Sequence, residues 1–269
     1  MGDRLLLVGC GKMGGAMLSG WIEHGADPGD IAVIEPHAES AAAAREAYGV
    51  TVMEDPSDLP NAPPAVVVFA VKPQTLPDMT SAYASVAASG AVVLSIAAGR
   101  PIGFFEGALG TGAAVVRSMP NTPAAVGRGI TAACANPNVS ETQRALCQRL
   151  LTAIGEVVWV EDESLIDAVT AVSGSGPAYV FLLIECMTEA GIAEGLPPDI
   201  AARLARATVA GSGELARLSD EDAAQLRINV TSPGGTTEAA LGVLMADDGM
   251  AAMMKRAIAA AARRSRELA

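Results

Sequence analysis

Short apolar runs alternate with amphipathic helical patterns over the first 160 residues of the chain. One run, Ala65–Val71, is apolar at every position, which is typical of a strand buried on both faces of a sheet. Regular alternation of strands and helices predicts a mostly parallel sheet covered by helices on both sides. The expected strands are Arg4–Val8, Ile31–Ile34, Val50–Val52, Ala65–Val71, Val92–Ile96, Ala113–Met119, Gly129–Ala135 and Val157–Val160. The helices expected between them include Leu76–Ala88 and Ser140–Ile154, the latter with Ser140 as its N-cap.

The pattern changes near Glu161, beyond which only helices are expected. We therefore predict an α/β domain over residues 1–160 and an all-helical domain over residues 161–269. The apolar stretch Ala178–Ile184 is too short to cross a bilayer by itself, so we expect a buried core or oligomer helix and no membrane segment. The expected helices of this half are Glu163–Ala171, Pro177–Glu194, Pro198–Leu218, Asp220–Val230, Thr236–Met245 and Met250–Leu268.

A glycine-rich turn, Gly9-Cys-Gly-Lys-Met-Gly14, follows the first expected strand directly and opens a helical pattern. In the dinucleotide-binding fingerprint the first glycine permits the tight turn, the second admits the pyrophosphate and the third lets helix and strand pack closely. The second strand ends in an acid, Glu35, about twenty residues after the glycines, as the fingerprint requires. The turn therefore predicts a Rossmann-like nucleotide site.

Small and polar residues follow three further strands, at the edge where open α/β sheets bind ligands. Lys72-Pro73-Gln74 follows one strand, Ala97 another, and Asn121 lies in the rigid turn Pro120–Pro123. We expect residues 70–74 to line the cofactor and Asn121 to be placed to hydrogen-bond a carboxamide. The alternative for residues 70–74 is an ordinary loop between a strand and a helix.

A second glycine-rich stretch, Ser232-Pro-Gly-Gly-Thr-Thr237, runs into a helix in the second half of the chain. The first amides of a helix have no partner inside it, so hydroxyls and glycines around them make an uncrowded cradle for a small anion such as a carboxylate. Taken alone, the stretch also fits an ordinary loop and helix cap.

Composition excludes several classes of function. The 269 residues carry a formal charge of −12, which argues against nucleic acid as a partner. Four cysteines occur without CxxC spacing and two histidines without a cluster, so neither a metal site nor a disulfide framework is expected. We expect free thiols in a reducing compartment, no signal peptide, and a soluble cytoplasmic protein.

The usual catalysts of dehydrogenases are missing from the second half. No histidine follows His37, and the three lysines, Lys12, Lys72 and Lys255, all lie outside residues 160–230. Tyr179 has no lysine four residues later. A reduction that needs little acid–base help fits these absences, and an imine is such a substrate because a protonated C=N accepts hydride directly.

Together these features closely resemble the pyrroline-5-carboxylate reductases along essentially the whole chain. The resemblance rests on Gly9–Gly14, Val71–Gln74, Met119–Pro123, Asp167–Tyr179 and Val230–Thr237. It implies reduction of 1-pyrroline-5-carboxylate by NADPH or NADH to L-proline, the last step of proline biosynthesis. It also implies a homodimer interlocked through the helical domain, able to form a larger ring, with each site completed by helices of the partner.

The resemblance assigns roles to individual residues. Thr237 would donate a hydrogen bond to the ring nitrogen and Ser232 would hold the substrate carboxylate. Glu163 would either reach the substrate or cap its own helix. The remaining substrate-binding candidates are Gly234, Gly235 and Thr236. The cofactor-binding candidates are Val8, Gly9, Cys10, Gly11, Lys12, Met13, Gly14, Glu35, His37, Ala70, Val71, Lys72, Pro73, Ala97, Asn121 and Asn229.

Glu35 bears on the choice of cofactor, because an acid at this position binds a free ribose 2′-OH and repels a 2′-phosphate. Glu35 therefore favours NADH, whereas the resemblance implies use of NADPH, often preferentially. We predict that both cofactors work, with unusually good use of NADH. Two alternative functions are a related reductase of another cyclic imine or 2-oxo acid, and a catalytically idle regulatory or assembly protein.

Overall fold

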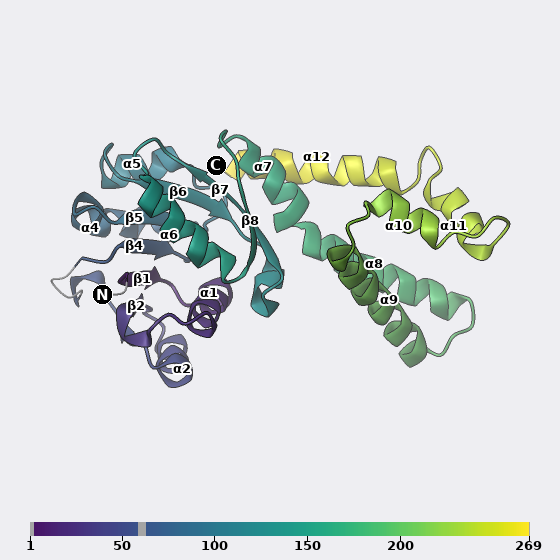
Figure 1. Ribbon diagram of the computed structural model, residues 1–269, viewed down its shortest axis with the longest axis horizontal. Coiled ribbons are helices and arrows are strands. Elements are labelled where there is room, and N and C mark those ends of the chain that lie inside the picture. The colour runs from purple at the N-terminus through teal and green to yellow at the C-terminus, as the bar shows by residue number, and fades with distance from the viewer. Residues whose placement is uncertain (1–2, 59–62, 269) are drawn as a thin grey trace. The chain divides into compact units, whose positions relative to one another are not determined.

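The computed structural model describes residues 3–58 and 63–268, which divide into two compact units (Figure 1). The first unit comprises Met1–Gly174 together with Ala261–Ala269, and the second comprises Ser175–Ala260. This division differs from the expected one after residue 160. The helical turns that follow residue 160, and the end of the last helix, pack with the α/β part of the chain.

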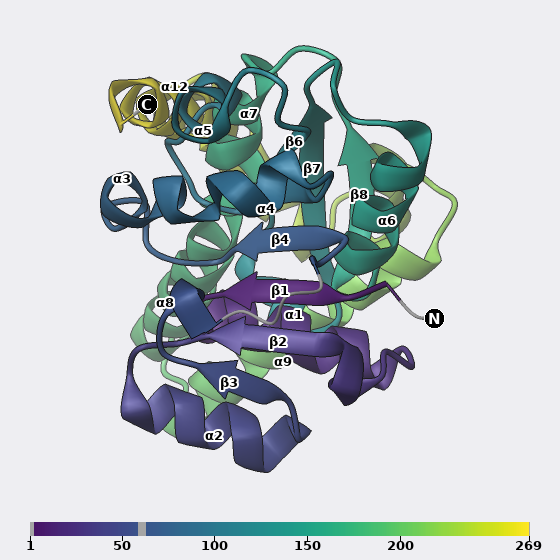
Figure 2. The ribbon, with the colours of Figure 1, turned by 90° about the vertical axis from the view of Figure 1, so that its left-hand side faces the viewer.

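The first unit is built on one sheet of eight strands. The strands are β1 (Leu5–Val8), β2 (Ile31–Ile34), β3 (Thr51–Met53), β4 (Val66–Phe69), β5 (Val92–Ser95), β6 (Val115–Met119), β7 (Gly129–Ala135) and β8 (Gly155–Trp159). Their order is β3-β2-β1-β4-β5-β6-β7-β8, and all neighbours are parallel except β6 and β7. Figure 2 shows β4, β1, β2 and β3 side by side. Every strand expected from the sequence is present, and the Rossmann-like fold is confirmed.

Helices cover both faces of this sheet, and each face has its own apolar core. Helices α1, α2 and α6 pack on one face, through side chains such as Leu18, Ala44 and Leu151. Helices α3, α4, α5 and α7 pack on the other. The helices are α1 (Lys12–Glu23), α2 (Ala38–Tyr48), α3 (Leu76–Met79), α4 (Ala84–Ala88), α5 (Ile102–Leu109), α6 (Glu141–Thr152) and α7 (Leu165–Val169).

Two predicted helices of the first unit illustrate how local chemistry sets helix continuity. The α6 helix begins as expected with Ser140 as its cap, in a reciprocal capping box with Gln143. The single helix expected over residues 76–88 is instead divided into α3, a 3₁₀ segment (Thr80–Tyr83) and α4. The hydroxyl of Thr80 donates to the Leu76 carbonyl at 2.7 Å, a back-bond that bends helices.

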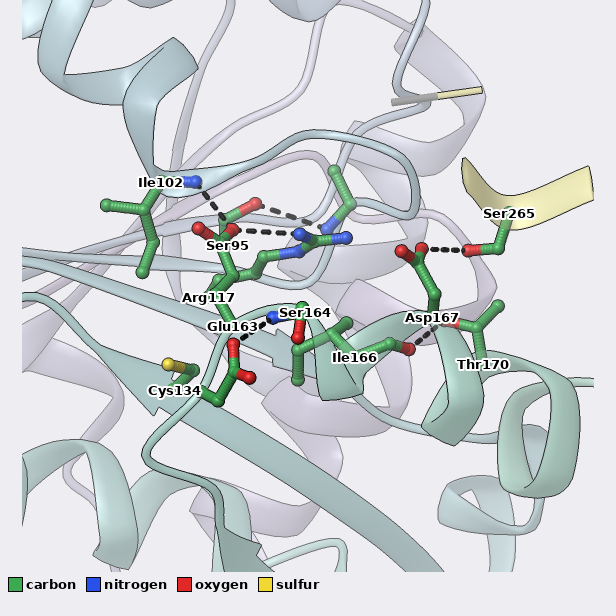
Figure 3. Close-up of polar contacts among 12 residues, drawn as sticks. Ser95, Ile102, Arg117, Cys134, Glu163, Ser164, Ile166, Asp167, Thr170 and Ser265 are labelled. Carbon is green, nitrogen blue, oxygen red and sulfur yellow. Dashed lines mark hydrogen bonds and ion pairs between the residues drawn. The ribbon is translucent and has the colours of Figure 1, made fainter. Parts of the chain in front are cut away.

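The end of α12 (Met250–Leu268) is fastened to the first unit. The Ser265 hydroxyl donates to Oδ1 of Asp167 on α7 at 2.6 Å (Figure 3). Ser265 is buried, and Gly99 approaches so closely that a Cβ there would lie 2.9 Å from the Leu268 carbonyl oxygen. Since Gly99 also has a φ of +68°, only glycine suits this contact.

The second unit is entirely helical and leaves much of its apolar surface exposed. Its only buried apolar residues are Ala201 and Ala205, although all of residues 175–260 are described. Large side chains such as Phe181, Leu204 and Val243 face outward. The helices are α8 (Gly176–Ala193), α9 (Pro198–Leu218), α10 (Ala223–Asn229), α11 (Thr236–Leu244) and the first part of α12. This unit lacks the core that an independent soluble domain needs.

We expected no segment long and apolar enough to cross a membrane. Judged by helix length and composition alone, that expectation is wrong. The helical run Leu165–Ala193 has 29 residues and passes that test. The sequence pattern showed only the central apolar stretch, whereas α7, a π-helical turn (Thr170–Gly174) and α8 follow one another almost without a break. Hardly any of the apolar part is buried within the chain. A surface of this kind also suits association with another protein chain.

We predict that Ser265→Ala loosens the end of α12. The substitution removes one hydrogen bond to a carboxylate, which stabilises the docked helix end by about 1–2 kcal/mol. Hydrogen exchange should accelerate in residues 261–268 and remain unchanged in β1 and β4. The matched control is Ser81→Ala, at an exposed serine. Equal exchange rates in Ser265→Ala and wild type would show that the bond does not hold the helix.

Candidate active site

The turn between β1 and α1 depends on two glycines in contact. The Gly9 N–H donates to the Ile34 carbonyl at 2.8 Å, and Gly9 has a φ of +92°, which favours glycine. A Cβ on Gly9 would lie 2.6 Å from Cγ1 of Val71, and a Cβ on Gly14 would strike the Gly9 carbonyl oxygen. Strand and helix can therefore approach this closely only without side chains at these two positions.

The remaining glycine of the turn faces open space. Gly11 is the N-cap of α1, with a φ of −70°, and a Cβ there would meet nothing within 4 Å. The first hydrogen bond of the helix runs from Gly15 N–H to Gly11 O, so the amides of Lys12, Met13 and Gly14 have no partner within it. Free amides at the positive end of a 12-residue helix suit a pyrophosphate. The residues present therefore fit a dinucleotide.

Glu35 lies beneath this turn with only 4% of its surface exposed. Its Oε2 accepts from Cys10 N–H at 2.8 Å and its Oε1 from His37 N–H at 3.0 Å. Burial, and then the charge of Glu35, raises the pKa of the Cys10 thiol, so Cys10 stays protonated at neutral pH. The expected contact of Glu35 with a ribose hydroxyl would have to share or replace these two bonds.

The other expected cofactor residues of the first unit follow the carboxyl ends of neighbouring strands. Ala70 N–H donates to Val8 O at 2.8 Å, and Ala97 N–H to the Ser95 hydroxyl at 3.2 Å. These residues therefore lie at one edge of the sheet, where such folds bind ligands. His37 and Lys72 are exposed there, while Val71 and Pro73 are partly buried.

Asn121, expected to bind a carboxamide, is held by the chain itself. Its Oδ1 accepts from Ile130 N–H at 2.9 Å, and its Nδ2 donates to Ser173 O at 3.2 Å. The side chain thus ties the turn after β6 to the start of β7 and to the π-helical turn. Its contact with the cofactor stays a prediction.

Glu163, which is partly buried, forms an ion pair with a buried arginine that the sequence analysis missed (Figure 3). Its Oε1 accepts from Nη1 of Arg117 and from Ile102 N–H, each at 2.8 Å. It therefore caps α5 rather than its own helix, where Asp162 instead accepts from Ser164 N–H. An arginine inside the apolar strand β6 was the available signal, because a buried guanidinium needs an acidic partner.

The glycine-rich stretch of the second unit forms a turn and a helix start, as expected. Gly234 has a φ of +71° and Gly235 is the N-cap of α11. The first helix bond runs from Ala239 N–H to Gly235 O at 3.2 Å, so the amides of residues 236–238 lack partners within the helix. Ser232 is exposed and Thr237 partly buried beside these amides. The binding of a carboxylate at this helix start stays a prediction.

Two side chains of this unit make contacts that the sequence analysis did not anticipate. Oε2 of Glu238 accepts from Gly234 N–H at 2.6 Å and so braces the turn. Asn229 donates to Oε2 of Glu221 at 2.9 Å and accepts from Gln225 at 2.8 Å. The predicted role of Asn229 near the cofactor stays a prediction.

Residues 3–58 and 63–268 contain no group of three or more His, Cys, Asp or Glu side chains arranged to hold a metal ion.

Comparison with known proteins identifies the family. The chain is 41% identical over 266 residues to the pyrroline-5-carboxylate reductase of Pseudomonas aeruginosa, covering 99% of this chain and 97% of that protein. The chain belongs to the pyrroline-5-carboxylate reductase family. Family models match residues 163–268 as the pyrroline-5-carboxylate reductase dimerisation domain and residues 4–99 as an NADP oxidoreductase, coenzyme F420-dependent, domain.

Solved structures of pyrroline-5-carboxylate reductases share this fold. The enzyme from Coxiella burnetii has a TM-score of 0.93 at 34% identity, over 99% of this chain and 98% of that one. The Plasmodium falciparum enzyme, solved with NADP bound, has a TM-score of 0.84 at 29% identity over the same shares. The fold and family inferred from the sequence motifs are thereby confirmed.

We predict that alanine impairs dinucleotide binding at one glycine of the turn and folding stability at another. Gly11→Ala should fold normally, with a melting temperature within about 2 °C of wild type, because its Cβ points into open space. It should weaken NADH and NADPH binding by about tenfold or more, since the Cβ occupies the space of the pyrophosphate. Gly14→Ala should instead lower the melting temperature of the ligand-free protein. Calorimetry and thermal unfolding measure both effects, and unchanged dinucleotide affinity in Gly11→Ala would contradict the proposed cradle.

We also predict that Glu163→Gln destabilises the ligand-free first unit by about 3 kcal/mol, because Arg117 would be left as a buried charge without its counterion. Urea unfolding in the absence of substrate measures this change. Glu156→Gln, at an exposed residue of β8, is the matched control and should have no effect. If both variants unfold at the wild-type midpoint, Glu163 has no structural role of this size.

Proposed function

We infer that this chain is an NAD(P)H-dependent oxidoreductase that reduces the C=N bond of 1-pyrroline-5-carboxylate to give L-proline, the last step of proline biosynthesis. The observation that carries the inference is the match to pyrroline-5-carboxylate reductases over 99% of the chain. The nucleotide cradle at Gly9–Gly14 supplies the physical basis for a dinucleotide.

The cofactor, when bound, supplies a hydride to C5 of the cyclic imine. The chain would hold the pyrophosphate on the amides that open α1, and the segments that follow β4 and β5 would line the rest of the cofactor. The substrate carboxylate, which the family motif places on the amides of residues 235–237 and the Ser232 hydroxyl, binds the Thr236 and Thr237 amides, since the Gly235 N–H already donates to Ser232 O at 3.0 Å. Thr237 donates a hydrogen bond to the ring nitrogen. These assignments for the substrate rest on the family motif and on the geometry of α11.

The absence of a histidine or lysine base from residues 160–230 suits this reaction. A protonated imine is already electrophilic, so orientation against the nicotinamide contributes most of what the protein adds. A related reductase of another cyclic imine or 2-oxo acid remains the second candidate.

We propose that the enzyme works as a homodimer. Its helical unit leaves Phe181, Leu204 and Val243 exposed, and residues 163–268 match a dimerisation family. Covering these side chains with a second copy would remove them from water and stabilise the unit. Residues 161–269 would then act as one substrate-binding and dimerisation domain, and dimers could join in a ring. We place the enzyme in the cytoplasm, without a nucleic-acid or membrane partner.

Oxidation of NADH and NADPH in the presence of pyrroline-5-carboxylate tests the activity directly. We expect turnover with both cofactors and formation of proline. A panel of other cyclic imines and 2-oxo acids tests the second candidate. Faster turnover of any of these than of pyrroline-5-carboxylate would overturn the substrate assignment.

We predict that Ser232→Ala and Thr237→Ala each lower kcat/KM for the imine by at least about tenfold, or about 1.4 kcal/mol of transition-state stabilisation. Each removes a hydroxyl donor from the helix start while leaving the backbone cradle intact. Thr142→Ala, at an exposed threonine of α6, is the matched control. If neither site variant differs from the control, these hydroxyls do not act on the substrate.

A further inference from the structure

We propose that Glu35 positions the glycine turn and does not select between NADH and NADPH. The proposal rests on dinucleotide binding as part of the proposed function. It concerns an acid at the end of β2, the position at which Rossmann folds commonly hold the ribose.

The carboxylate of Glu35 links two segments of backbone that meet at the cofactor edge. Oε2 holds Cys10, which lies inside the glycine turn, at 2.8 Å. Oε1 holds His37, which is the N-cap of α2, at 3.0 Å. The Glu35 N–H itself donates to Met53 O at 2.9 Å, which fixes the residue to β3. Glu35 therefore connects the β1–α1 turn to the β2–α2 connection through two hydrogen bonds.

The burial of Glu35 favours its hydrogen bonds to the Cys10 and His37 amides over a hydrogen bond to a ribose hydroxyl. Glu35 is 4% exposed, and a buried carboxylate is stable only when hydrogen-bond donors satisfy it. Here both oxygens already accept from backbone amides. A ribose hydroxyl would have to enter a buried space and share an oxygen with Cys10 or His37. The ordinary ribose-binding acid, by contrast, offers an oxygen that faces the cofactor.

The bond to Cys10 also orients the next part of the turn. Cys10 immediately precedes Gly11, whose open face receives the pyrophosphate. If the Cys10 amide is released, the turn loses the contact that fixes its path into α1. The pyrophosphate is common to both dinucleotides, so the loss must weaken both by the same factor. A residue that contacts the ribose 2′-hydroxyl or 2′-phosphate would instead change the ratio of the NADH and NADPH dissociation constants.

Glu35→Gln tests this distinction, because glutamine keeps the size of the side chain but can accept at only one of its two terminal atoms. Calorimetric binding of NADH and of NADPH is measured without imine, with Glu46→Gln on the exposed side of α2 as the control. We expect both dissociation constants to rise by about tenfold, with their ratio within about twofold of wild type. A relative gain of NADPH over NADH of about tenfold or more would overturn the proposal.

Hydrogen exchange in the wild-type protein provides a second test that does not depend on the folding of a variant. The Cys10 and His37 amides should exchange slowly without a dinucleotide, because both are bonded to Glu35 in the ligand-free chain. Fast exchange at Cys10 would overturn the proposal. A wild-type chain that binds neither dinucleotide would overturn both this proposal and the proposed function, whereas normal binding with a shifted ratio in Glu35→Gln overturns this proposal alone.

Discussion

The contact between Gly9 and Gly14 is the constraint on which the nucleotide site depends. It brings α1 against the end of β1, where any side chain would collide with backbone or with Val71. Only this close approach directs the unpaired amides of the α1 start to the carboxyl edge of the sheet. Glu35 then fixes the turn from below by holding Cys10, so the turn is shaped by glycine sterics and by one buried carboxylate.

The apolar surface of the helical unit is the second feature of consequence. A unit in which only Ala201 and Ala205 are buried apolar residues has too little core to be stable by itself. The same exposed helices belong to the region that matches a dimerisation family. The dimer proposed above would provide the core of this unit and complete the substrate site, and would thereby couple folding to activity.

Most of the fold could be predicted from the sequence, because it is encoded in local patterns. Fully apolar runs such as Ala65–Val71 located the strands, and Ser140 located a helix start. The pairing of side chains distant in sequence could not be predicted in this way. Arg117 meets Glu163 across 46 residues, and Cys10 meets Glu35 across 25, contacts that only the assembled sheet brings together. The continuity of α7 and α8 was missed because a π-helical turn does not follow the helical period of 3.6 residues.

The central claim is that this chain transfers hydride from a nicotinamide to the carbon of a cyclic imine. The most direct measurement uses NADH carrying deuterium at both positions of nicotinamide C4, together with pyrroline-5-carboxylate and the wild-type enzyme. Mass spectrometry and NMR of the product then locate the label. We predict proline with one deuterium at C5. Unlabelled proline, or no proline at all, would contradict the account.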